Sequence, residues 1–146
     1  MYGGVSVWRN YMRVIRLSSR FYEKYAVCPE IMQKPKRPYY CLEVRVREKT
    51  FAIPFRHHIK HQYAFYTVAD AGLDYTKAVL ITDDAMISDD VVRVDTAEWR
   101  LINRSEDTIF SGFVKYLRLY EKAKKKMSVP KYKKIVEFSA LQYFDL

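Results

Sequence analysis

The sequence predicts a single α+β domain in which an antiparallel sheet is followed by two helices. Residues 42–47 alternate apolar with charged side chains, as a half-buried strand does. Residues 109–120 carry apolar side chains at the i, i+3, i+4, i+7 spacing of an amphipathic helix. The 146 residues contain no internal repeat and no segment with the composition of a linker, and this length fits one domain.

A short helix is the first element that the sequence predicts. Ser18 and Ser19 precede the run of residues 20–25, and serine is a favoured N-cap because its hydroxyl accepts a backbone N–H. Residues 33–38 hold two prolines and three cations, so we expect an exposed basic loop there. Residues 1–12 lack a clear periodicity and are predicted to be an N-terminal extension, with residues 13–146 forming the domain.

Several short runs predict the sheet. Residues 48–50 would turn the chain from the first strand into a second strand over residues 51–55, with Pro54 at the strand's end or at a sheet edge. Gly72 is predicted to mark a turn. Further strands are predicted over residues 63–67, 78–81 and 91–94.

The last third of the chain is predicted to be helical. The first helix covers the apolar repeat from Ile109 to Tyr120, and lysines crowd its C-terminal end, where the helix dipole favours cations. Apolar side chains between Ile135 and Phe144 indicate a second, shorter helix that packs back on the core.

Charge and aromatic content favour a nucleic-acid partner. The chain has 26 Lys and Arg against 17 Asp and Glu, a net charge of +9, together with 13 Tyr and 8 Phe. Basic surfaces attract polyanions, and aromatic rings stack on unpaired bases. The side chains that we predict to bind RNA are Ser19, Arg20, Lys34, Lys36, Arg37, Lys122, Lys124, Lys125 and Lys126.

Cysteine usage and hydropathy predict a cytoplasmic protein. Cys28 and Cys41 are too few for a small secreted disulfide scaffold, so we expect two reduced thiols. No apolar run reaches the roughly 18 residues that cross a bilayer, and the start of the chain lacks a signal-peptide core.

All three histidines of the chain fall within five positions, directly after the second predicted strand. Imidazoles titrate near neutral pH, and Arg56 and Lys60 stand beside them as permanent cations. RNA cleavage without a metal needs a base for the 2′-OH, an acid for the leaving 5′-oxygen and cations around the phosphorane. We predict that His57 transfers the proton, that Arg56 and Lys60 stabilise the charge, and that His58 or His61 is the second proton carrier.

Two other interpretations of this segment stay open. The histidines could simply be solvated, or His57 and His61 could bind zinc with His58 or Cys41, although the neighbouring cations would repel a metal.

The acidic pairs at 83–84 and 89–90 would suit a two-metal nuclease, but acidic pairs in loops are usually solvated. The chain has no glycine-rich phosphate loop, no Gly-x-Ser-x-Gly elbow and no Cys–His pair with nucleophile spacing, which disfavours NTPases, hydrolases with such sites and proteases. We therefore predict no metal and no cofactor.

Three stretches of the chain also resemble a known family. They are Leu-Ser-Ser-Arg-Phe-Tyr at 17–22, Phe-Ala-Ile-Pro-Phe-Arg-His-His-Ile-Lys-His at 51–61, and Gly-Leu-Asp-Tyr-Thr-Lys-Ala-Val at 72–79. In this order they resemble the toxins of type III toxin–antitoxin systems, the ToxN/AbiQ-like group, and they are most similar to its TenpN branch. The resemblance runs from about residue 13 to the C-terminus.

The resemblance implies a fold, an activity and a partner. The fold is a compact, strongly twisted antiparallel sheet flanked by helices, similar to the Kid/MazF toxins. The activity is sequence-selective, metal-independent cleavage of cellular or phage RNA, leaving a 2′,3′-cyclic phosphate and a 5′-hydroxyl, in phage defence by abortive infection. The inhibitor is a repeated small RNA antitoxin, often a pseudoknot, which the toxin cuts from its precursor and with which it assembles.

The family's catalytic segment follows a proline and an apolar residue, so here it would begin after Pro54 and Phe55. ToxN-type segments have a Thr-Ser pair followed by Lys, whereas this chain has Arg56 and His57 in those places. An active-site tyrosine of the family maps best onto Tyr22, where it would position or stack a base. The sequence thus predicts an RNA-inhibited toxin endoribonuclease, and a non-catalytic RNA-binding regulatory module is the alternative.

Overall fold

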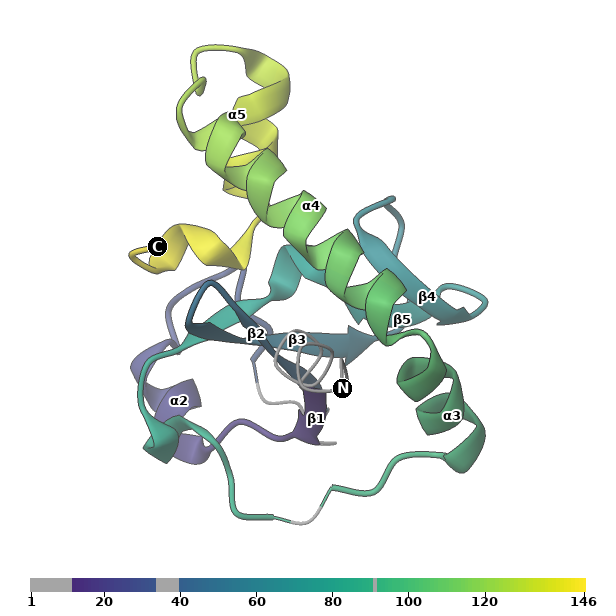
Figure 1. Cartoon of the computed structure of the whole chain (residues 1–146). Helices are drawn as coiled ribbons and strands as arrows, with labels where there is room; N and C mark the ends of the chain where they lie inside the picture. The colour runs from purple at the N-terminus through teal and green to yellow at the C-terminus, as the bar shows by residue number, and fades with distance from the viewer. Residues whose placement is uncertain (1–11, 34–39, 91) are drawn as a thin grey trace.

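The computed structural model describes residues 12–33, 40–90 and 92–146. These residues form one α+β domain with a six-stranded sheet, in which every pair of strands is antiparallel, and four α-helices (Figure 1). The predicted α+β class and the antiparallel sheet are confirmed. The predicted positions Lys34, Lys36 and Arg37, and residues 1–11 of the predicted extension, lie outside the described residues. Met12, predicted to be the last residue of the extension, instead begins the first strand, because it pairs with Val44.

The sheet is organised around its third strand. The strands are β1 (Met12–Ile15), β2 (Cys41–Val46), β3 (Lys49–Arg56), β4 (Ala64–Val68), β5 (Ala71–Asp74) and β6 (Val79–Ile81). Their order is β1-β2-β3-β5-β4, and β6 also pairs with β3. Beside β2, β3 therefore has two partners in succession: β6 along its first half and β5 at its end. Of the predicted strand at 91–94, residues 92–94 have no regular structure.

Strand β2 buries its apolar face as predicted and exposes Arg45, but Glu43 on the other face is buried. Glu43, on the face predicted to be exposed, is only 6% exposed, because β1 pairs beside it and Arg13 Nε donates to its carboxylate at 2.6 Å. The β2–β3 turn consists of Arg47 and Glu48, whose φ angles are 53° and 67°. Positive φ at both central residues is the turn geometry that matches the twist of a hairpin.

Pro54 lies inside the central strand, not at its end or at an edge as predicted. On one side it pairs with Cys41 of β2. On its other side, the pairs with β6 end at Ala52 and those with β5 begin at Phe55. Pro54 thus falls in the gap between two partner strands, where the backbone N–H that proline lacks is not needed.

Gly72 is a strand residue of β5, so the predicted turn at this position is wrong. A Cβ atom there would lie 2.1 Å from the carbonyl oxygen of Phe65 in β4. The turn falls instead just before β5, where Ala69 has a φ of 50°. Glycine is needed at position 72 because the two strand backbones approach closely there.

Four helices flank the sheet: α2 (Ser19–Lys24), α3 (Thr96–Arg104), α4 (Glu106–Lys124) and α5 (Pro130–Glu137). Ser18 caps α2 as predicted, and its hydroxyl accepts the N–H of Phe21, which is fully buried. α3 was not predicted; it begins after Asp95, whose carboxylate accepts the N–H of Glu98. None of the helices in the described residues is both long and apolar enough to cross a bilayer.

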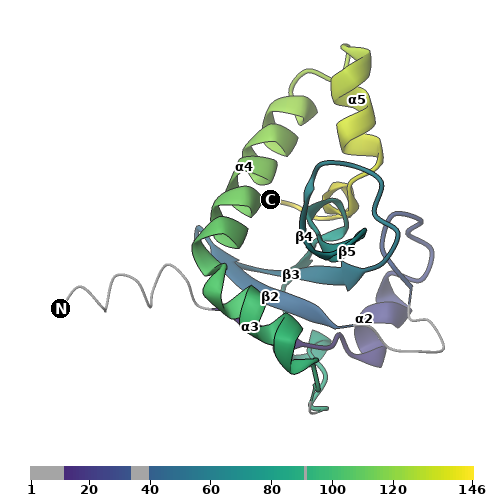
Figure 2. The same ribbon diagram turned by 90° about the vertical axis from the view of Figure 1, so that its right-hand side faces the viewer.

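The predicted helix at 109–120 is confirmed as the centre of α4. Its apolar face is buried, and Phe113 contacts Phe51 of β3 edge-on with ring centroids 5.2 Å apart. The predicted final helix divides in two: α5 ends at Glu137, and a 3-10 turn, Ala140–Tyr143, follows. Ser139 begins this turn by accepting the N–H of Leu141. Figure 2 shows α4 and α5 as the two arms of a helical hairpin rising from the sheet.

Replacing Gly72 by Ala should destabilise the fold by about 3 kcal/mol, because the new Cβ meets rigid backbone rather than a movable side chain. The midpoint of urea unfolding measures this effect. Ala69→Gly is the matched control in the same hairpin, and it should not destabilise, because glycine adopts a positive φ without strain. A Gly72→Ala protein as stable as the wild type would contradict this account of β4–β5 packing.

Candidate functional site

The polar segment that the sequence singled out forms the loop after β3. β3 ends at Arg56, and the chain reaches β4 only at Ala64. Ile59 anchors the middle of the loop: it is 4% exposed, and its N–H donates to the carbonyl of Asp70 at 2.9 Å. The side chains on either side of this anchor are therefore held at a defined place rather than on a free loop.

Arg56 is fixed by a fully buried carboxylate. Its Nη1 donates to Oδ2 of Asp74 at 2.9 Å, and the Asp74 side chain is 0% exposed whereas that of Arg56 is 31% exposed. Thr76 completes the carboxylate's shell, since its backbone N–H and its hydroxyl both donate to Oδ1, at 2.9 and 2.7 Å. Arg56 keeps further N–H donors, because a guanidinium has five.

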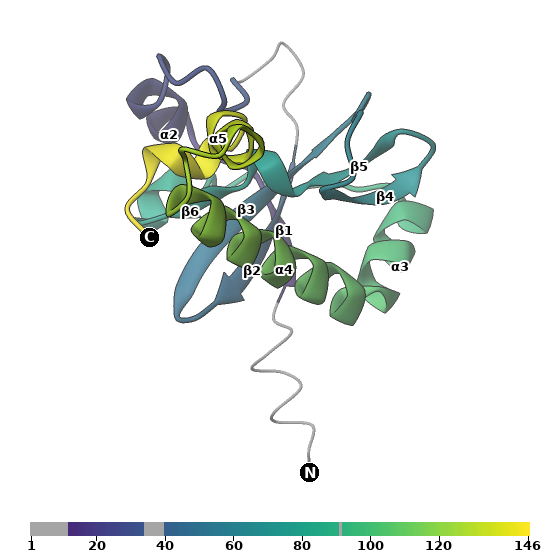
Figure 3. The same cartoon turned by 90° about the horizontal axis from the view of Figure 1, so that it is seen from above.

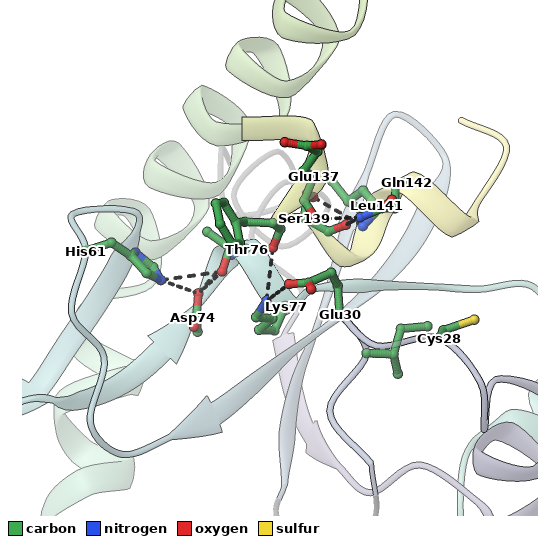
Figure 4. A network of polar contacts seen from close by, with 12 residues as sticks. Cys28, Glu30, His61, Asp74, Thr76, Lys77, Glu137, Ser139, Leu141 and Gln142 are labelled. Carbon is green, nitrogen blue, oxygen red and sulfur yellow. Dashed lines mark hydrogen bonds and ion pairs between the residues drawn. The ribbon is translucent and has the colours of Figure 1, made fainter. Parts of the chain in front are cut away.

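His61 binds the same carboxylate from the other end of the loop (Figure 4). Its Nδ1 accepts the backbone N–H of Tyr63 at 3.0 Å, so in the neutral ring the proton is on Nε2. Nε2 lies 3.2 Å from Oδ1 of Asp74 and 3.4 Å from the hydroxyl of Thr76. Both ring nitrogens are thus engaged, and this geometry suits a residue that positions Asp74 better than one that exchanges protons with a substrate.

The electrostatics of Asp74 follow from these contacts. Burial alone would raise its pKa, but the hydrogen bonds from His61 and Thr76 and the positive charge of Arg56 outweigh it, and the pKa is lowered. Asp74 is therefore ionised at neutral pH and holds both ends of the loop.

His57 lies apart from this network. Its ring contacts Phe55 edge-on at 5.6 Å, and Phe55 in turn stacks on Tyr40 at 5.0 Å. Successive side chains of a strand point to opposite faces, so His57 follows Phe55 while Arg56 points to Asp74. The predicted cluster is therefore divided, since Arg56 and His61 meet at Asp74. His57 is an exposed ring that makes no hydrogen bond within the part of the chain that the structure describes.

His58 is the neighbour of His57 in space as well as in sequence, with ring centroids 6.3 Å apart. Its side chain is 83% exposed, and its Nδ1 lies 3.3 Å from Oδ2 of Asp70. Its backbone has a φ of 59°, in the left-handed region that is unfavourable for residues other than glycine. Strained backbone of this kind is concentrated at functional sites, which draws attention to this residue.

A pocket of about 360 Å³ opens beside Arg56 and His61. Its walls come from the loop, from the turn after β5, from α4 and from α5 with the residue that follows it. Rings and aliphatic carbon make up most of the surface, and three cations stand around it. The lining residues are Arg56, His61, Tyr63, Thr76, Lys77, Tyr116, Lys134, Ile135 and Phe138.

Lys77 ties this pocket to the N-terminal part of the domain (Figure 4). Its Nζ donates to Oε1 of Glu30 at 2.6 Å and to the carbonyl of Phe138 at 3.0 Å, and its side chain is 15% exposed. Lys77 therefore holds the chain at Phe138 in place, because a largely buried ion pair with a second hydrogen bond is rigid.

Other predicted residues lie away from this pocket. Ser19, Arg20 and Tyr22 belong to α2, which Figures 1 and 3 show on the opposite side of the molecule from the β4–β5 hairpin. Tyr22 does not line the pocket, and its ring contacts Phe21 edge-on at 5.5 Å. The structure therefore does not bring Tyr22 together with Arg56 and His61. Lys60 is exposed on the loop.

The predicted lysines at the end of α4 form an exposed basic patch with α5. Lys122 and Lys131 both lie over the ring of Tyr132, at 5.5 and 5.0 Å from its centroid. A hydrogen bond with Lys122 lowers the pKa of the Tyr132 hydroxyl. Lys124, Lys125 and Lys126 are exposed beside this pair. α5 connects the patch to the pocket, because it also carries Lys134.

Sequence reasoning missed most of the pocket. Asp74, Thr76 and Lys77 stand in the third stretch that carries the family resemblance, and a polar Asp-x-Thr-Lys run between two buried strands could have indicated them. Tyr63, Tyr116 and Phe138 offer no such signal. Their spacing is that of ordinary core positions, and only the folded α4–α5 hairpin brings them together.

The described residues contain no group of three or more His, Cys, Asp or Glu side chains that could hold a metal ion. The alternative zinc site of the three histidines with Cys41, and the two-metal site of the acidic pairs, are therefore not formed. Cys28 and Cys41 are unpaired thiols. Burial raises the pKa of Cys41.

Comparison of the chain with protein-family models, curated proteins and solved structures found no match.

Replacing Asp74 by Asn should destabilise the protein by about 3 kcal/mol at pH 7, because it leaves Arg56 and His61 without their shared anion. The pKa of Asp74 is lowered from 3.8 in the folded protein, so its contribution is present above that value and lost as pH falls through the lowered pKa. Urea unfolding of both proteins from pH 7 to pH 2 measures the difference. A difference independent of pH would show that the carboxylate charge is not what stabilises the loop.

Proposed function

We propose that the protein is the toxin endoribonuclease of a type III toxin–antitoxin system, which cuts RNA without a metal ion and is inhibited by a repeated small RNA. The observation that supports this most is the pair of exposed imidazoles of His57 and His58, 6.3 Å apart. At this spacing two rings can contact the attacking and the leaving oxygen of one phosphodiester.

The chemistry follows from the environments of the two rings. His57, without a hydrogen-bond partner, takes the proton of the ribose 2′-OH as the 2′-oxygen attacks phosphorus. His58, whose Nδ1 lies 3.3 Å from Asp70, acts as the acid and gives a proton to the 5′-oxygen as the P–O5′ bond breaks. The products are a 2′,3′-cyclic phosphate and a 5′-hydroxyl. His57 then releases its proton to water, and His58 takes a proton from water, which restores both rings. His61 holds Asp74 instead of carrying a proton, so between the two predicted second carriers we propose His58.

The cations of the loop have a separate role. The phosphorane carries more negative charge than the phosphodiester, and Arg56 and Lys60 stand on either side of the histidine pair in the loop. Arg56 is oriented by Asp74, whereas Lys60 is free to follow the substrate. Both charges should also make RNA binding weaken steeply with salt, because each phosphate contact releases counterions.

The basic patch of the α4–α5 hairpin supports an RNA inhibitor in this proposal. It combines Lys122 and Lys131 with the ring of Tyr132, and the net charge of the chain is +9. A folded RNA lying along the patch would reach the pocket, to which Lys134 on α5 belongs. In the cytoplasm such an antitoxin would cover both the patch and the histidine loop.

Purified protein should cleave single-stranded RNA in the presence of EDTA, and His57→Ala should slow cleavage by about 100-fold or more, the usual contribution of a positioned proton-transfer group. Rates and product ends are measured together, and cyclic-phosphate ends are expected. The rate should depend on pH near the histidine range.

Lys49→Ala is the control for this experiment. It removes one exposed positive charge at the other end of β3 and should leave the cleavage rate unchanged. The wild type could instead bind RNA in a salt-dependent way and leave it intact. That result would contradict the proposed endoribonuclease activity and favour the RNA-binding module.

Replacing His58 by Gly should separate stability from activity. The left-handed backbone at this position costs about 1–2 kcal/mol for a residue with a Cβ, so glycine should leave the protein as stable or more stable. Cleavage should nevertheless fall by about 100-fold, because the proposed acid is lost.

His58→Ala is the matched control, since it keeps the strained backbone and removes the imidazole. It should cleave as slowly as His58→Gly while being the less stable of the two in urea. Wild-type cleavage by His58→Gly would exclude His58 as the acid.

A further inference from the structure

The pocket beside the loop contains surface that the proposed cleavage chemistry does not use. The reaction needs His57, His58 and the loop cations, but the pocket walls are formed mainly by Tyr63, Tyr116, Ile135 and Phe138. A cavity of about 360 Å³ is within the range of sites that bind small organic groups. Its composition, rings with a few cations around them, is that of a site for an aromatic group attached to an anion.

We propose that this pocket binds the base of a nucleotide next to the phosphodiester that is cut, and thereby determines where the RNA is cleaved. The inference rests on the proposed function, because it places a part of the RNA substrate. It adds a subsite made by Phe138 and Tyr63, separate from the groups that move protons.

Phe138 is the strongest sign of a ligand. Its side chain is 60% exposed although it is a large aromatic residue, and it stands at the rim of the pocket directly after α5. Most of the other aromatic rings of the α4–α5 region pack into the core, such as Phe113 and Tyr120. An exposed ring at the rim is well placed to stack on a base.

A hydrogen bond from Lys77 fixes the backbone at Phe138. Lys77 donates to the Phe138 carbonyl at 3.0 Å and pairs with Glu30 at 2.6 Å. With its charge balanced in this way, Lys77 is a positioning residue rather than a phosphate ligand. The ring of Phe138 is therefore presented on a rigid support, which reduces the entropy lost when a base stacks on it.

Tyr63 provides a second ring in the lining of the pocket, next to polar groups. Tyr63 lies 6.0 Å from the ring of His61 and 5.9 Å from that of Tyr116, so the three rings form a continuous surface. Burial raises the pKa of Tyr116, opposed in part by the hydroxyl of Ser139, so this phenol stays neutral and contributes surface rather than charge. Arg56 and Lys134 both line the pocket and supply positive charge for the phosphates next to a bound base.

The pocket shares Arg56 and His61, the two ends of the histidine loop, with the site described above, although His57 and His58 do not line it. Arg56 lines the pocket and is the residue directly before His57, and His61 closes the same loop. A base held in the pocket would place its own phosphate beside Arg56, at the start of the loop that carries the histidine pair. One nucleotide in the pocket can in this way fix the register of the whole RNA strand.

The test compares two small probes on the purified protein, adenosine 3′-phosphate and ribose 5-phosphate, by NMR titration. Both carry a sugar and a phosphate, and only the first carries a base. The nucleotide should bind more tightly, with shifts at His61 and Thr76, and Phe138→Ala should weaken its binding by about ten-fold while leaving ribose 5-phosphate unaffected. Met127→Ala is the control, because Met127 is also an exposed apolar side chain but does not line the pocket.

Cleavage of a mixed-sequence RNA by the same variants gives the second readout. Phe138→Ala should change which positions are cut, whereas His57→Ala should slow all cuts alike. Equal binding of the two probes, or nucleotide binding that Phe138→Ala leaves unchanged, would contradict base binding in the pocket even if RNA is cleaved. Nucleotide binding that depends on Phe138 in a protein that never cleaves RNA would support the pocket and reject the proposed enzyme.

Discussion

The buried carboxylate of Asp74 is the constraint on which the rest of this site depends. It is fully buried at the end of β5, and its two oxygens receive donors from β3, from the loop and from the turn that follows β5. An ion without partners in such a position would be too costly to bury, so Arg56, His61 and Thr76 have to converge on it. The loop between Arg56 and His61 is held at both ends for this reason. The exposed side chains of His57 and His58 therefore stand on a backbone that is fixed at each end.

The same arrangement gives the three histidines, which are indistinguishable in the sequence, different surroundings. Of the three histidines, one is engaged through both nitrogens, one faces Asp70, and one contacts the rings of Phe55 and His58. The three histidines meet different partners because the loop between β3 and β4 places each of them at a different point. The histidine that is best satisfied is the least suited to exchange protons, and the strained, exposed one is the better candidate.

The sequence predicted the parts of the fold that depend on local patterns. The Ser18 cap, the β2–β3 hairpin and the repeat of α4 were identified because each is specified by residues close together in the chain. Pro54 and Gly72 were misplaced because their roles depend on which strand lies opposite, which a local pattern does not record. In the site, the loop was found by its composition, whereas Asp74 was missed because a single acidic residue before a buried run is unremarkable until its partners fold around it. The pocket could not be predicted, because its lining residues come from the loop after β3, the turn after β5, α4 and α5, which lie together only in the folded protein.

The bond from Lys77 to Phe138 has a consequence for a chain that is still being synthesised. It joins residues 61 positions apart, and the pair with Glu30 adds a separation of 47. β2 to β6 can pair as soon as they leave the ribosome, but the pocket needs α5 as well, and contacts over such separations form late. A nascent chain would therefore form its histidine loop before the walls of the pocket beside it are complete.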